Sequence, residues 1–200
     1  MALLFANNNS LSAITTKPSG LSGGSMNLIS TQTASSSSTI SFTSGIDSTY
    51  DEYVFKFYNM HPATNNVLFQ VNFRDGGTNY DATKTTTFFR AYHEENGSAA
   101  SLAYNASLDL AQSTAFQPLS FTIGNDNDQS FSGSLRIFNP ASTTFVKHFI
   151  STGNEYNSND FCQTSFSAGY GNTTSAVDAI RFQINSGNID AGDICLYGIA

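Results

Sequence analysis

Apolar and polar residues alternate with a period of two along most of the chain. The clearest example is the run in which Phe69, Val71 and Phe73 alternate with Gln70 and Asn72. This period places successive side chains on opposite faces of a β-strand, so the segment is predicted to be a strand with one buried face. The same pattern predicts further strands at residues 39–43, 53–58, 86–93, 119–123, 131–138, 144–150, 161–167, 179–185 and 194–199.

Turn residues separate these segments, for example Asp75-Gly76-Gly77 and Asn96-Gly97, where glycine tolerates a positive φ. Residues 99–112 carry only loosely spaced apolar positions and are expected to form a loop with one helical turn. Many short strands without a long amphipathic helix indicate an all-β fold, an antiparallel β-sandwich resembling a jelly roll, over residues 26–200. Its core is predicted to include Phe55, Phe57, Phe69, Val71, Phe73 and Phe182.

Residues 1–25 differ from the rest because Asn, Ser and Gly dominate and the apolar residues are scattered. Such a composition cannot bury enough apolar surface to offset chain entropy, so this segment is predicted to be an extended N-terminal arm, flexible or bound to a partner. No positive residue precedes its short apolar part, so a signal peptide is not expected. The predicted anchoring residues of the arm are Leu3, Leu4, Phe5, Leu11, Ile14 and Leu21.

Charge is sparse: only 12% of the residues are charged, and the formal net charge is −7. Binding of nucleic acid requires clustered Lys and Arg, which the chain lacks, so no nucleic-acid partner is expected. The negative charge also disfavours an anionic membrane surface, and no apolar run approaches the length of a membrane span.

The two cysteines, Cys162 and Cys195, form no CxxC pair and have no histidine at metal-ligand spacing. Two interpretations stay open at this point. The favoured one is two small buried apolar residues, and the other is a disulfide between late strands.

Catalytic chemistry is not expected, and neither is a cofactor. His61, His93 and His148 lie far apart in the sequence, and no GxSxG elbow accompanies them. Asp126 and Asp128 alternate as in a calcium loop, but the glycine and glutamate of an EF-hand are missing. An acidic β-turn is the preferred interpretation of these two residues, and calcium is the alternative.

Several tyrosines lie in or near predicted loops, where their rings could stack on sugars. Packing in the core or at an interface is the favoured alternative for these rings, and tryptophan, a common sugar-stacking residue, is absent. The possible ligand-facing tyrosines are Tyr80, Tyr92, Tyr104, Tyr156 and Tyr170.

Three motifs resemble a known group of proteins. Ser186–Ile199 (SGNIDAGDICLYGI) resembles the closing hairpin of many small β-sandwich virion proteins of tailed bacteriophages, of the kind found in phages of marine bacteria and cyanobacteria. Thr49–Phe55 (TYDEYVF) and Asn72–Tyr80 (NFRDGGTNY) resemble a core strand and a turn of the same group. The resemblance spans residues 28–200 and implies decoration, fibre or tail-appendage proteins with jelly-roll-like sandwiches. These motifs are structural, so no catalytic or binding residue is carried over with them.

The sequence therefore leads to a specific expectation. The chain is predicted to be a phage virion structural protein, a capsid decoration or cement protein outside the head, which assembles in the host cytoplasm. Its expected partners are the major capsid protein or other virion proteins and further copies of itself, as a homotrimer. The alternative is a tail or head appendage, a fibre tip with lectin-like receptor binding, for which a glycan is the partner.

Overall fold

The structure is a computed structural model that describes residues 26–200. Every regular element in this range is a β-strand, which confirms the predicted all-β class. The strands are β1 (Met26–Thr33), β2 (Ile40–Phe42), β3 (Glu52–Pro62), β4 (Phe69–Arg74), β5 (Lys84–Glu94), β6 (Ala100–Tyr104), β7 (Gln117–Pro118), β8 (Phe131–Phe138), β9 (Lys147–Tyr156), β10 (Phe161–Gly171), β11 (Ala179–Ile184) and β12 (Ile189–Ile199).

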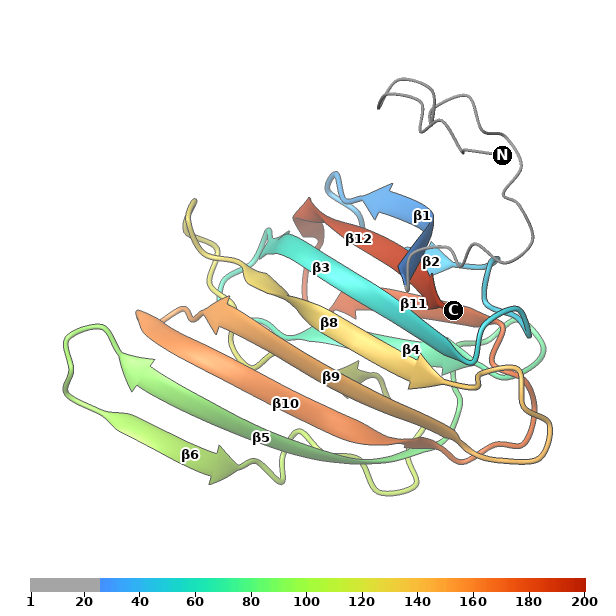
Figure 1. Ribbon diagram of the computed structural model, residues 1–200. Coiled ribbons are helices and arrows are strands. Elements are labelled where there is room, and N and C mark those ends of the chain that lie inside the picture. The colour runs from blue at the N-terminus through green and yellow to red at the C-terminus, as the bar shows by residue number, and fades with distance from the viewer. Residues whose placement is uncertain (1–25) are drawn as a thin grey trace, which may run out of the picture.

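The strands form two antiparallel sheets that pack face to face (Figure 1). The large sheet has eight strands in the order β1-β12-β3-β8-β9-β10-β5-β6. The small sheet has four strands in the order β2-β11-β4-β7. Figure 1 shows the small sheet behind the large one, with β5 and β6 extending past it.

The predicted jelly-roll character is visible in the strand order. If β5–β6 and β9–β10 are set aside, β1-β12-β3-β8 and β2-β11-β4-β7 remain as two four-stranded sheets. Along the chain, every step from one of these strands to the next changes sheet except the step from β4 to β7. This is the double-sheet arrangement of an eight-stranded jelly roll. The four remaining strands are two inserted pairs, and they extend the large sheet side by side beyond β8. We call these four strands, β9, β10, β5 and β6, the extension.

Aromatic side chains fill the space between the two sheets. Phe57 and Phe69 face each other from opposite sheets with ring centroids 5.1 Å apart, and Phe182 stacks on Phe69 at 5.7 Å. Edge-to-face and offset pairs of this kind stabilise a core beyond the apolar area they bury. All the phenylalanines predicted for the core, together with Val71, are at most 1% exposed, which confirms the strand registers assigned to them.

The sequence-based prediction was wrong for the middle of the chain. Residues 99–112 contain strand β6, which pairs with β5, rather than a loop with a helical turn. Residues 119–123 are not a regular strand: Ile123 forms only isolated bridges to Val67 and Asn157. A segment with a weak alternation of apolar and polar residues can still form a strand when a neighbouring strand pairs with it. The period of the sequence alone does not show this.

The C-terminal motif is also placed differently from the expectation. β11 and β12 do not form a hairpin, because β11 pairs with β2 and β4 and β12 pairs with β1 and β3. Gly187, with φ of 82°, lies in the connection that carries the chain from one sheet to the other. β12 lies inside the large sheet, between β1 and β3.

The extension has an unusual distribution of polar groups. Its inner side buries Lys84, Lys147, Gln163 and Glu155, each with no exposed surface. Each makes hydrogen bonds: Lys84 Nζ donates to Asn72 Oδ1 at 2.5 Å, and Lys147 Nζ donates to the Phe145 carbonyl at 2.7 Å. The inner side of the extension thus buries polar side chains together with the apolar rings of Phe88 and Phe149.

Candidate functional site: the outer face of the eight-stranded sheet

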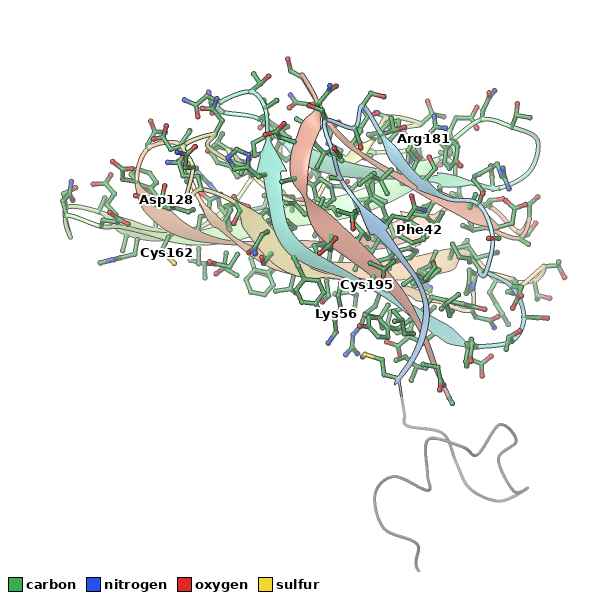
Figure 2. All side chains as sticks on the ribbon, turned by 90° about the horizontal axis from the view of Figure 1, so that it is seen from above. Phe42, Lys56, Asp128, Cys162, Arg181 and Cys195 are labelled. Carbon is green, nitrogen blue, oxygen red and sulfur yellow. The ribbon has the colours of Figure 1, made fainter. Side chains whose placement is uncertain are left out.

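The side of the eight-stranded sheet that faces away from the four-stranded sheet is a broad surface, which we call the outer face. In Figure 2, Lys56, Cys195 and Cys162 point to this side, Phe42 lies between the sheets and Arg181 lies on the opposite side. Strand pairing explains the grouping, because side chains at paired positions lie on the same side of a sheet. Phe89 on β5 pairs with Phe166 on β10, for example, and their rings stack at 4.7 Å.

Large exposed apolar side chains are concentrated on the outer face. Residues 26–200 have eight of them, and all but Phe145, in the β8–β9 connection, occupy outward positions of the large sheet. Scattered exposed apolar residues are normal, but a concentration on one face indicates a contact surface. The seven are Met26, Leu28, Tyr58, Phe89, Leu102, Tyr104 and Ile150.

Charge on the outer face is low and balanced. The outward positions of six strands carry two basic and two acidic side chains, and the acidic ones are Glu52 and Asp193. The positions counted are those from Glu52 to Tyr58 on β3, from Asp193 to Ile199 on β12, and all of those on β8, β9, β10 and β5. The basic ones are Lys56 and Arg136, and Arg136 Nη1 lies 3.4 Å from Glu52 Oε1. The negative charge of the chain therefore resides mainly outside this face.

The outer side of the four-stranded sheet is different, because polar side chains cover it. Arg181 lies over the ring of Tyr80 at 4.0 Å, and its Nε donates to Ser41 Oγ at 2.9 Å. Arg74 Nε donates to Asp178 Oδ1 at 2.8 Å. This contrast within one molecule indicates that the apolar character of the outer face is not a general property of the surface.

A hollow of about 490 Å³ lies on the extension, over β9, β10 and β5. The small Ala168 leaves space between the larger outward side chains His148, Ile150 and Tyr170. The rings of His148 and Tyr170 are 6.1 Å apart, inclined at 63°. No Lys, Arg, Asp or Glu lines the hollow, so it is suited to an uncharged group.

The predicted ligand-facing tyrosines do not come together as one platform. Tyr104, Tyr156 and Tyr170 occupy outward positions of the extension, where Tyr104 donates to Asp109 and Tyr156 to Asp160. Burial, followed by the hydrogen bond to Asp160, raises the pKa of Tyr156 to about 12, so its hydroxyl stays protonated at neutral pH.

The other two tyrosines lie elsewhere. Tyr92 points inward and stacks on Phe161 with centroids 5.3 Å apart, and Tyr80 lies on the opposite side of the molecule, beneath Arg181. Tyr92 and Phe161 are both half-buried, so this stacked pair lies outside the aromatic core between the sheets.

Sequence reasoning missed Phe89, Ile150 and Leu102. A signal was present for the first two, because Phe88-Phe89 and Phe149-Ile150 place large apolar residues on both faces of a strand at one point. A strand that is apolar on both faces is buried or lies at a contact. Leu102 gave no such signal, because its strand was not predicted.

The favoured interpretation of the cysteines was wrong for Cys162. Cys162 is exposed on β10, opposite His93, and Cys195 is half-buried on β12. Both thiols are free, and three strands, β3, β8 and β9, separate their strands within the sheet. Two free thiols thus lie on the outer face.

The acidic turn at Asp126 is closed by its own hydrogen bonds. The Gln129 N–H donates to the Asp126 carbonyl at 2.9 Å, and the Asp126 N–H donates to Gln129 Oε1 at 3.1 Å. In the part of the chain that the structure describes, no three His, Cys, Asp or Glu side chains form a group that could hold a metal ion.

The three histidines stay apart, on β3, β9 and the outward side of β5. His61 Nε2 is 3.2 Å from the Asp126 carbonyl. His61 Nδ1 is 4.0 Å from Asp190 Oδ2.

The predicted anchoring residues Leu3, Leu4, Phe5, Leu11, Ile14 and Leu21 lie outside the described residues. From residue 26 onward, no helix is long and apolar enough to cross a membrane. Comparison with known proteins gives no match to a family model, to a curated protein or to a solved structure.

Proposed function

We propose that this chain is a structural protein of a tailed-phage particle, a decoration or cement protein on the outside of the head. The observation that carries the proposal is the outer face, where seven large apolar side chains are exposed and the charges balance. Concentrated apolar surface of this kind serves contact with other proteins. The phage setting rests on the resemblance of the three motifs.

The fold and composition support a structural role. A jelly-roll sandwich presents long, rigid strands whose side chains are fixed in position, which suits repeated contacts in a particle. Edge strands such as β1 and β6 expose unpaired backbone groups, and assembly is one way to cover them. The expected partners are therefore the major capsid protein and further copies of this chain.

Quantitative mass spectrometry of purified particles of the phage that encodes the chain tests the proposal. A decoration protein is expected at a copy number comparable with that of the major capsid protein. Absence of the chain from the particles would refute the virion role. A copy number far below that of the capsid protein would refute decoration and favour an appendage.

The hollow on the extension favours one second candidate, a head or tail appendage that binds a receptor glycan. Aromatic faces pack on the apolar face of a sugar, and Tyr170 and His148 lie beside a hollow with no charged lining. Glycan-array binding that Tyr170→Ala abolishes would support this candidate. The matched control is Tyr80→Ala, which removes a tyrosine ring on the opposite side of the molecule.

A further inference from the structure

We propose that the outer face packs against the same face of a second copy of this chain, so that the protein forms a twofold symmetric dimer through its eight-stranded sheets. This inference concerns the protein in solution and does not depend on the virion role. It assigns the outer face to one of the expected partners, a further copy of the chain, and it replaces the homotrimer expected from the sequence with a dimer. The proposed occupant of the outer face is a second copy of the chain. Three properties of the face support this proposal: its charge, its size and its shape.

The first property is charge. The chain has a formal net charge of −7, so two copies repel each other over most of their surfaces. On the outer face the two basic residues, Lys56 and Arg136, balance the two acidic ones, Glu52 and Asp193. The outward strand positions therefore add no net repulsion to self-association, whereas a strongly basic partner would find no acidic patch among them.

The second property is size. Eight strands at a spacing of about 4.8 Å, most of them eight to eleven residues long, give a face of roughly 1,200 Å². A standard protein interface buries about 800 Å² on each partner. The outer face is therefore large enough for a stable dimer, and two sheets can pack face to face with their side chains interdigitated.

The third property is shape and self-complementarity. In a twofold interface the same patch serves both partners, so a protruding group and a hollow must be present on one surface. Leu102 is 72% exposed on β6, and the hollow beside Ile150 and Ala168 lies on the same face, over β9, β10 and β5. The Leu102 side chain and the hollow are both apolar, so the protruding side chain of one copy can insert into the hollow of the other.

Analytical ultracentrifugation from micromolar to near-millimolar protein tests the proposal directly. The wild type is expected to reach twice its monomer mass of 21.5 kDa. Ile150→Glu should weaken dimerisation at least tenfold, because symmetry adds two carboxylates to the apolar interface and makes both facing surfaces negative. Leu102→Glu should act in the same direction. Ile150 is 50% exposed and Leu102 72%, so neither change should disturb the fold, and thermal melting checks this.

Phe145→Glu is the matched control, because Phe145 is equally large and apolar and is 69% exposed but lies outside the strands. It should leave dimerisation unchanged. A monomer at the highest concentration, a trimer, or equal loss in the control and in Ile150→Glu would each overturn the face-to-face dimer.

The exposed thiol of Cys162 gives an independent measurement, because it lies on the outer face. Its rate of reaction with a maleimide should fall as the protein concentration rises and the dimer forms. In Ile150→Glu the rate should stay at the monomer value over the same range. A Cys162 rate that does not change while the mass doubles would show that the copies associate through another surface.

Discussion

Glu155 should make the protein less stable as the pH rises from acid toward neutral. Its carboxyl is fully buried on the inner side of the extension, where the Phe121 N–H donates to Oε1 at 2.8 Å. The side chains of Gln163 and Ser165 also donate to it, and Arg90 lies nearby. Burial outweighs these favourable contacts and raises the pKa of Glu155 from 4.5 to about 7.

The direction of the effect follows from proton linkage. A pKa that is higher in the folded than in the unfolded state means that the folded protein binds the proton more tightly. The resulting stabilisation is fully present below about pH 4.5, is lost as the pH rises to about 7, and changes no further above that. Each pKa unit corresponds to about 1.4 kcal/mol, so the total loss is about 3 kcal/mol.

Urea denaturation of the wild type and of Glu155→Gln, from about pH 4 to about pH 8, measures this loss. The difference between their free energies of unfolding removes the contributions of all other groups. It should shift by about 3 kcal/mol in favour of the variant across this range. Glu95→Gln, at an exposed glutamate, controls for the loss of one negative charge. Parallel pH profiles for the wild type and Glu155→Gln would refute the argument that this carboxyl is buried in the protonated form near pH 6.

Three further predictions concern the core and the arm. Phe69→Ala should lower the free energy of unfolding by about 3–5 kcal/mol in urea denaturation, because the ring is fully buried among other aromatic rings; a loss below about 1 kcal/mol would contradict the register of β4. Gly153→Ala should cost about 1–3 kcal/mol, since a Cβ there would lie 2.2 Å from the Phe131 ring, and a variant with an unchanged melting temperature would contradict this packing. Deletion of residues 2–25 should leave the melting temperature nearly unchanged and strongly weaken binding to empty phage shells; full occupancy by the truncated protein would show that the folded domain makes the contact.

The sequence predicted the parts of the fold in which each strand has one apolar and one polar side. Residues 53–58 and 69–73 alternate cleanly because β3 and β4 face the shared core, and β8 was predicted with its observed bounds. When one face of a strand packs against the other sheet, alternation with a period of two specifies which side chains are buried. The sequence pattern alone is sufficient to predict such strands.

Prediction failed where the strands depend on a neighbour. β6 has a weak pattern and exists because β5 pairs with it, and β9 begins at Lys147 rather than at residue 144. The connection from β11 to β12 has the turn residues of a hairpin, but the chain changes sheets there. Which strands pair is a non-local property, and local turn chemistry does not specify it.

The extension was the least predictable region because its strands carry large apolar residues on both sides and ionisable residues on the inner side. Strands usually bury their apolar side, yet in the extension Lys84, Lys147 and Glu155 are buried while Phe89 and Ile150 are exposed. Burying ionisable groups and exposing large apolar ones both cost free energy, so the stability of a lone monomer does not account for this arrangement. The free-energy cost of exposing these apolar side chains to water is removed if another protein surface covers them. The same strands that depart from the usual pattern thus form the hollow and most of the apolar outer face, and this coincidence is the strongest structural reason to regard that face as a site of contact.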